Sequence, residues 1–244
     1  MKVACIGGGP AGLFYAICHK LRAPGDTAVV FERNRRDDTF GFGIVLSNRV
    51  SVCYTLASTI VFGALFGFIN SAQQVYVGIY GLGVWFPVVF AGIAGMMALS
   101  SFLNSRLVGR LGMRRLSHGA LLGFLAISAV WLFWSLTGPV PFVVFLTLFA
   151  SAMFLFGWIG SNFNAISMEP LGHIAGTAAS VQGFIQTLGG AIIGTIIGQS
   201  FDGTITPLAT GFCSVAFAGL LMVLIGEGGK LFTAPSQPKA AINP

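Results

Sequence analysis

Charge is scarce in this chain. Only 8% of its 244 residues are Asp, Glu, Lys or Arg, whereas 55% are hydrophobic. Soluble domains carry about 25% charged residues, because a surface in water needs them. The composition therefore excludes an ordinary soluble domain and predicts that lipid solvates most of the chain.

Carboxylates are almost absent beyond residue 49. The only acids there are Glu169, Asp202 and Glu227, while the other four of the seven lie within the first 38 residues. This change of composition near residue 48 predicts three parts: a βαβ fragment over 1–47, a transmembrane part over 48–232 and a cytoplasmic tail over 233–244. Glu169 and Asp202 fall at the ends of apolar stretches, which favours solvated or loop-capping roles over a proton relay.

Cysteine is rare as well. Cys5, Cys18, Cys53 and Cys213 lack the spacing of metal ligands, so we expect no metal site and read them as small apolar residues in reduced surroundings. A secretory signal is not expected either. The apolar run Val3–Cys18 contains the sequence Gly7-Gly8-Gly9-Pro10, and no small-residue cleavage site precedes the charged stretch that follows.

Long apolar stretches dominate the rest of the chain. Each has about 21 to 26 residues, enough to cross a hydrocarbon core of about 30 Å at about 1.5 Å per helical residue. None contains Asp, Glu, Lys or Arg. We predict six transmembrane helices, over residues 50–70, 81–104, 116–137, 140–163, 174–199 and 204–226.

The basic residues predict an orientation. The connection Ser105–Arg115 carries Arg106, Arg110, Arg114 and Arg115, whereas the first, third and fifth connections have no Lys or Arg. Arg49, Lys230 and Lys239 fall on the same side. Because positive residues are retained in the cytoplasm, we expect an inner-membrane protein with both termini cytoplasmic. The net charge of +6 then reflects topology, and no nucleic-acid partner is expected.

Small residues cluster in the fifth stretch. They are Gly176, Ser180, Gly183, Gly190, Gly194 and Gly198, with Gly189 beside Gly190. Small residues on one helix face let two backbones approach closely, which predicts helix packing through Gly183, Gly190 and Gly194. The alternative is a bending or gating role, because adjacent glycines also loosen a helix.

Two segments of the membrane part resemble a known family. Leu103–Arg115, with Gly112 near its end, is similar to the basic cytoplasmic loop of major facilitator superfamily transporters, although Gly109 replaces the expected aspartate. Asn162–Ala178 resembles the junction between the tenth and eleventh helices of the drug:proton antiporter branch, the bicyclomycin and chloramphenicol exporters. The resemblance runs from about Asn48 to Phe232 and implies the C-terminal, six-helix half of such a transporter.

This resemblance implies a substrate site near the midplane, between two halves. The chain would then need a second half or a copy of itself, and would exchange a small hydrophobic drug-like substrate for protons. Candidate substrate-facing groups are Asn70, Gln73, Gln182 and Gln186, with Trp85, Trp131, Trp134 and Trp158 as aromatic contacts or interfacial anchors. Arg110 and Arg114 would either fix topology alone or pair with helix ends or acids and favour the inward-closed state.

The first 47 residues carry a dinucleotide-binding pattern. A short apolar run, Lys2–Ile6, precedes Gly7, Gly9 and Gly12, and an apolar helical stretch leads to a second run, Ala28–Phe31, that Glu32 closes. In this pattern the glycines allow a tight turn, close approach to a pyrophosphate and helix–strand packing. The acid binds ribose hydroxyls, and the helix N-terminus holds the phosphates.

The same segment resembles the start of an FAD-dependent aromatic hydroxylase of the salicylyl-CoA hydroxylase type, through Phe31–Arg35 and Asp37–Val45. The resemblance implies that Gly7, Gly9, Gly12, Glu32 and Arg33 would contact FAD. It stops near Ser47, and one βαβ unit leaves both sheet edges unpaired. We therefore expect no enzyme and no bound cofactor, with FAD binding as the alternative.

The sequence as a whole favours a multidrug transporter half, incomplete or chimeric, embedded in a lipid bilayer. The alternatives are an FAD-dependent monooxygenase fragment without activity of its own, and a membrane protein that inserts without transporting anything.

Overall fold

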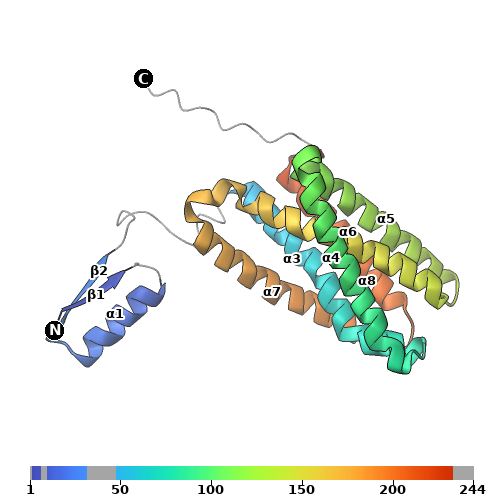
Figure 1. The fold of residues 1–244 in the computed structure, drawn as a ribbon, viewed down its shortest axis with the longest axis horizontal. Coiled ribbons are helices and arrows are strands. Elements are labelled where there is room, and N and C mark those ends of the chain that lie inside the picture. Colours follow the sequence, from blue (N-terminus) through green and yellow to red (C-terminus); the bar gives the residue numbers. More distant parts are fainter. Residues whose placement is uncertain (1, 7–9, 32–47, 233–244) are drawn as a thin grey trace, which may run out of the picture. The chain divides into compact units, whose positions relative to one another are not determined.

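The computed structural model describes residues 2–6, 10–31 and 48–232, which fall into two compact units, Met1–Phe40 and Gly41–Pro244. The first unit contains β1 (Lys2–Ile6), α1 (Pro10–Arg22) and β2 (Thr27–Phe31) (Figure 1). The two strands pair in parallel, with Lys2 opposite Thr27 and Ile6 opposite Phe31. This is the predicted βαβ order.

Only one of the five candidate cofactor-binding residues lies within the described part of the chain. Gly12 lies in the first turn of α1. Gly7, Gly9, Glu32 and Arg33 lie outside the described residues.

The second unit is a helical bundle, and its described part confirms the prediction of six long apolar helices. They are α3 (Arg49–Gln73), extended by the π-helical η1 (Gln74–Ile79); α4 (Phe86–Leu111), preceded by the short η2 (Gly83–Trp85); α5 (Met113–Thr137); α6 (Phe142–Met168), followed by η3 (Glu169–Ile174); α7 (Ala175–Gln199); and α8 (Thr206–Gly226). Each is long and apolar enough to cross a membrane.

The predicted arginine loop is mostly helix, and this corrects the sequence interpretation. We expected a connection over Ser105–Arg115, but α4 continues to Leu111 and α5 begins at Met113. Only Gly112 separates the two helices. Its φ is 82°, a value that residues other than glycine rarely adopt. No residue before Gly112 forces the chain out of the helix, and arginines at a membrane surface reach water from a helical backbone. Arg106 and Arg110 therefore lie on α4.

Aromatic side chains pack inside the bundle, toward the end opposite the arginines. The rings of Phe68 on α3 and Phe149 on α6 lie 4.3 Å apart between centroids. Trp131 on α5 packs against Phe149 and against Phe212 on α8. All four side chains are almost completely buried. Burial of such side chains contributes about 1.5 to 3 kcal/mol each in water, but in lipid their close packing takes over that role.

Helices α3 and α7 run parallel in close contact (Figure 1). A Cβ atom at Gly194 would overlap the Cβ of Phe66 and lie 2.7 Å from the backbone nitrogen of Gly67. On the other side of the contact, Gly67 accommodates Ile197, whose Cγ2 would lie 2.8 Å from an added Cβ. Gly194 and Gly67 therefore set the distance between these two helices, as small residues do in membranes.

The other predicted packing glycines behave differently. A Cβ at Gly190 would lie 3.3 Å from the ring of Phe66, a tight but adjustable contact. Gly183 has open space around it, with no atom within 4 Å of an added Cβ. Gly183 thus takes no part in this packing, because the glycines that contact α3 closely lie further along α7, from Gly189 to Gly198.

Candidate functional site: a charge cluster and an amide network

A charge cluster lies at the end of the bundle that carries Arg49, Gly112 and Glu227, called here the basic end. Arg114, in the first turn of α5, donates from Nη1 to Glu169 Oε2 at 3.1 Å and from Nε to Glu227 Oε1 at 2.9 Å. The Arg114 and Glu227 side chains are 12% and 9% exposed, whereas that of Glu169 is 42% exposed. One guanidinium therefore joins the start of α5 to the ends of α6 and α8.

Two further residues continue the cluster into the bundle. Tyr54 on α3 donates its hydroxyl hydrogen to Glu227 Oε1 at 2.8 Å. The same hydroxyl lies 2.7 Å from Nε2 of His118 on α5, and both side chains are completely buried. The cluster thus connects four helices, because Tyr54 adds α3 to the three that Arg114 joins.

The remaining arginines are arranged more simply. Arg106 lies over the ring of Phe102, 5.2 Å from its centroid. Arg49 donates to the backbone oxygen of Ile225. Among the residues that the structure describes, Arg110 and Arg115 have no ion pair. Of the two arginines that the resemblance associates with helix ends or acids, Arg114 contacts two acids, whereas Arg110 has no ion pair within the described part of the chain.

Buried amides form a second network nearer the middle of the bundle. Gln186 on α7 donates from Nε2 to Ser58 Oγ on α3 at 3.1 Å, and Ser58 donates to Asn164 Oδ1 on α6 at 3.2 Å. Gln182 donates to the same Asn164 oxygen at 2.7 Å. Gln182 and Gln186 are 5% and 9% exposed. These two candidate substrate-facing groups are therefore bonded inside the bundle, because an unpaired amide is costly in an apolar medium.

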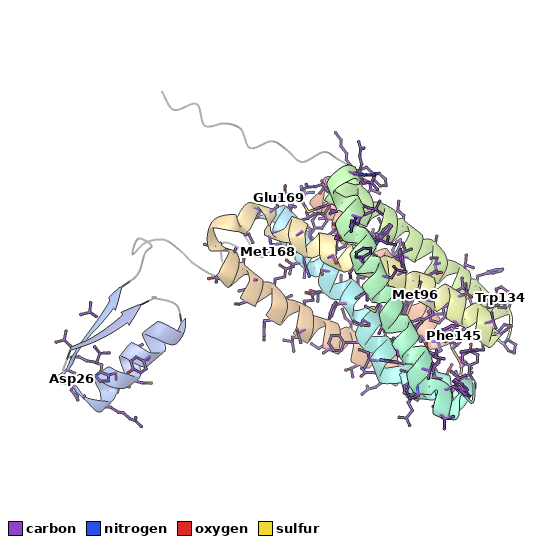
Figure 2. The ribbon with its side chains drawn as sticks, viewed as in Figure 1. Asp26, Met96, Trp134, Phe145, Met168 and Glu169 are labelled. Carbon is purple, nitrogen blue, oxygen red and sulfur yellow. The ribbon has the colours of Figure 1, made fainter. Side chains whose placement is uncertain are left out.

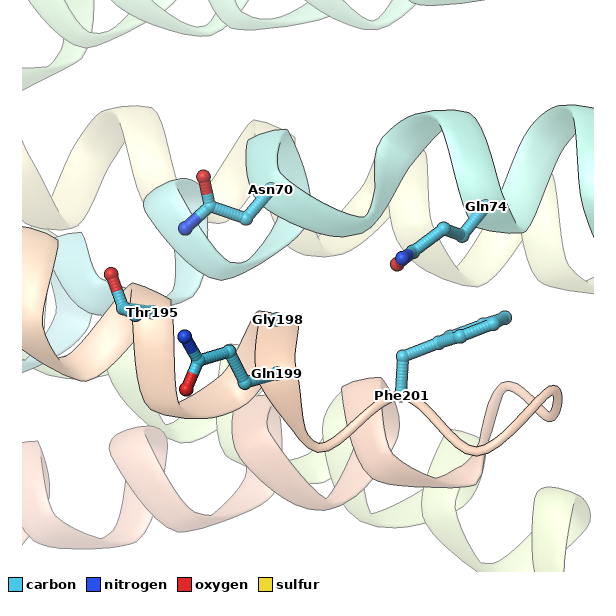
Figure 3. Close-up of a pocket in the computed structure, with 6 residues that line it drawn as sticks. All are labelled: Asn70, Gln74, Thr195, Gly198, Gln199 and Phe201. Carbon is cyan, nitrogen blue, oxygen red and sulfur yellow. The ribbon is translucent and has the colours of Figure 1, made fainter.

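The other two candidates lie toward the opposite end of the bundle. Asn70 lines a hollow of about 420 Å³ between α3 and α7, together with Gln74, Thr195, Gly198, Gln199 and Phe201 (Figure 3). Gln73 is exposed and does not line the hollow. Amide and hydroxyl groups with one aromatic ring can hold an uncharged molecule that both accepts and donates hydrogen bonds.

The tryptophans divide into two groups. Trp131 is completely buried in the aromatic core, and Trp158 donates from Nε1 to the backbone oxygen of Ser100 at 2.9 Å. Trp85 is 64% exposed and Trp134 is 42% exposed. Trp134 lies at the opposite end of the bundle from Glu169 (Figure 2). None of the four lines the hollow.

Asp202 lies in the connection between α7 and α8. Its Oδ1 accepts from the hydroxyl of Thr204 at 2.6 Å and from the backbone N–H of Thr204 at 2.9 Å. These two hydrogen bonds hold the pKa of the Asp202 carboxyl below its usual value. Asp202 thus caps a loop, as its place at a helix end predicts.

Several residues of the two networks escaped the sequence interpretation. Tyr54, His118 and Ser58 lie within apolar stretches and match no motif. Glu227 was visible as one of only three acids beyond residue 49. That rarity was the available signal, because a carboxylate beside a membrane helix needs a cation nearby.

Three known proteins are similar to parts of this chain. A bicyclomycin resistance protein homolog of Haemophilus influenzae is 32% identical over 159 residues, which are 64% of this chain and 39% of that protein. The uncharacterized MFS-type transporter YdgK of Bacillus subtilis is 27% identical over 195 residues, 76% of this chain and 47% of that protein. Salicyloyl-CoA 5-hydroxylase of a Streptomyces species is 65% identical over 48 residues, 20% of this chain and 9% of that protein.

Both predicted resemblances are confirmed, one to major facilitator transporters and a short one to the hydroxylase at the N-terminus. The chain spans less than half the length of each of these relatives. No family model and no solved structure matches it.

Proposed function

We propose that this homologue of major facilitator drug-resistance proteins is a membrane transporter half that exports small hydrophobic drug-like molecules in exchange for protons. The observation that carries the proposal is the polar lining between α3 and α7, in a bundle whose helices are mostly apolar. Polar groups at membrane depth are costly and generally mark a transport pathway. The similarity to a bicyclomycin resistance protein homolog supports the substrate class.

Transport through this pathway requires a second protein surface that closes the hollow at Asn70. The hollow at Asn70 is formed by one face of α3 and α7, whereas transporters of this architecture bind substrate between two halves. We propose that a second transporter half, or a second copy of this chain, covers that face. The bilayer is the partner that the six apolar helices require.

The orientation belongs to the same proposal. The arginines of α4 and α5 lie at the basic end, together with Arg49. Because cationic residues are retained on the cytoplasmic side, we propose that the basic end faces the cytoplasm and that the protein resides in the inner membrane with both termini cytoplasmic.

Export should depend on the polar hollow. In cells without drug exporters of their own, we expect the chain, expressed alone or with the N-terminal half of a related exporter, to lower the accumulation of a fluorescent drug. Asn70→Leu should abolish most of this effect, since it removes an amide that lines the hollow. The matched control is Gln73→Leu, which changes an exposed amide outside the hollow. Equal accumulation in cells with and without the chain, at equal membrane abundance, would contradict the proposal.

The alternative is a flavin-dependent hydroxylase fragment, favoured by the 65% identity of its short match and by the parallel βαβ order. The described residues of this unit offer a helix N-terminus that suits a phosphate. They do not form a site for a flavin ring, because a parallel sheet normally needs further strands and cover on both faces. We propose that the chain binds no cofactor and is not an enzyme.

Purified protein should therefore be colourless after incubation with FAD and removal of the excess. The measurement is the absorbance of the flavin against protein concentration. Gly12→Leu, in the first turn of α1, is the control for a positive result, because it would block the approach of a pyrophosphate. Stoichiometric yellow protein that turns colourless in Gly12→Leu would instead support the hydroxylase alternative.

A further inference from the structure

The chain beyond α8 turns back onto the basic end of the bundle. Gly228 and Gly229 adopt φ values of 65° and 82°, and the N–H of Gly229 donates to the backbone oxygen of Leu224 at 2.8 Å. This is a common way for a helix to end. The residues Gly228–Phe232, called here the return segment, follow α8 along this turn.

The return segment is held by His118. The backbone N–H of Phe232 donates to His118 Nδ1 at 3.0 Å, and the two rings contact edge to face, 5.7 Å apart between centroids. Leu231 packs against the hydrophobic core. Phe232 has a φ of 64°, which is unfavourable for a residue with a side chain and persists only where contacts impose it. The return segment is therefore docked by specific contacts.

The hydrogen bonds determine the protonation of His118. Because Nδ1 accepts from Phe232, it carries no hydrogen. In the neutral ring the hydrogen is then on Nε2, which donates to the hydroxyl oxygen of Tyr54 at 2.7 Å. Tyr54 in turn donates to Glu227. Every polar atom of the neutral imidazole is paired, and all of these bonds run in one direction, from Phe232 to Glu227.

A second proton would break this arrangement at one point. Protonated Nδ1 becomes a donor and faces the N–H of Phe232, so two donors meet and the docking bond is lost. Burial of the ring and the charge of Arg114 oppose this proton, whereas Glu227 favours it. Arg114, Glu169 and Glu227 together carry one negative charge. Imidazole is also the side chain that takes up a proton in the physiological range.

The groups that face His118 come from each element packed around it. Tyr54 is contributed by α3, Arg114 by α5 itself and Glu227 by the end of α8, while Glu169 in η3 acts through Arg114. Among the hydrogen bonds of His118, only the one between Nδ1 and Phe232 loses its acceptor when the imidazole gains a proton. The response is therefore confined to the return segment.

We propose that His118 is a proton-binding site that controls the docking of the return segment: the segment is bound while His118 is neutral and is released when Nδ1 is protonated. The proposal goes beyond transport and holds whether or not the bundle moves a substrate. Release loosens the chain at Phe232, beyond the Gly229 turn that ends α8.

Amide hydrogen exchange at single-residue resolution, on the full chain in detergent, tests the proposal. After correction for the intrinsic pH dependence of exchange, the Phe232 amide should be protected at about pH 8 and should exchange at least about fivefold faster at about pH 5. The Gly229 amide is the internal control, because its acceptor is a backbone carbonyl that does not titrate in this range.

Two variants assign the response to His118. His118→Asn places a non-titrating oxygen near the position of Nδ1, so Phe232 should stay protected at both pH values. His118→Phe removes the acceptor, so Phe232 should exchange rapidly at both. Unchanged amide protection along α6 shows that each variant is folded. Protection of Phe232 that does not change with pH in the unaltered protein overturns the proposal, as does a pH response that persists in His118→Asn.

Discussion

Replacing Arg114 by methionine should destabilise the six-helix bundle by about 3 to 5 kcal/mol. The substitution removes the guanidinium that both Glu169 and Glu227 accept from. Because the Glu227 side chain is only 9% exposed, water cannot replace the guanidinium, and a buried charge that loses a cationic partner is strongly destabilising. The measurement is the free energy of unfolding of the purified protein in detergent, from a denaturant titration.

Two controls separate this effect from a general loss of packing. Glu169→Gln removes the exposed half of the same ion-pair system, and should cost less than about 1 kcal/mol. In the double variant Arg114→Met, Glu227→Gln the buried charge is gone as well, and most of the lost stability should return. A free energy for Arg114→Met that equals that of Glu169→Gln would contradict a buried role for Arg114.

Gly194→Ala should destabilise the bundle by about 1 to 3 kcal/mol, although alanine favours a helix more than glycine does. The added methyl group meets the backbone of α3 at Gly67, 2.7 Å away, as well as the Cβ of Phe66. A backbone cannot rotate aside as a flexible side chain does, so α3 and α7 must separate. The same denaturant titration measures the change.

The matched control lies on the same helix. Gly183→Ala adds the same methyl group where no atom lies within 4 Å, so we expect no loss and a gain of up to about 1 kcal/mol from helix propensity. Opposite signs for the two substitutions would show that the spacing of α3 and α7 depends on Gly194. If both variants lose stability equally, the glycines act through helix flexibility, which is the alternative that the sequence left open.

The six membrane helices could be predicted from the sequence because each is defined by its own composition. About 20 apolar residues without a charge span the hydrocarbon core whatever their neighbours are, and the structure places helices at all six stretches. Helix ends were less predictable. Leu111 lies beyond the predicted end of α4, since arginine does not stop a helix at a membrane surface and only Gly112 allows the turn.

The pairing of side chains could not be predicted. The sequence shows Arg114, Glu169 and Glu227 as rare charges, but they are separated by 55 and 113 residues, and only the packing of α5, α6 and α8 brings them together. The same holds for Gln182 and Gln186. Their spacing of four residues indicates one helix face, but which face meets Ser58 and Asn164 depends on the glycine contact between α3 and α7.

By itself, therefore, the sequence determined the local properties of this protein: the solvent of each segment, the six spans, the βαβ order and the two resemblances. These follow from composition and short-range spacing. The tertiary structure alone decided which polar groups are buried, which glycine limits a helix contact, and that His118 holds Phe232. Those features depend on distances between residues far apart in the chain, and such distances are set by how the helices pack against one another.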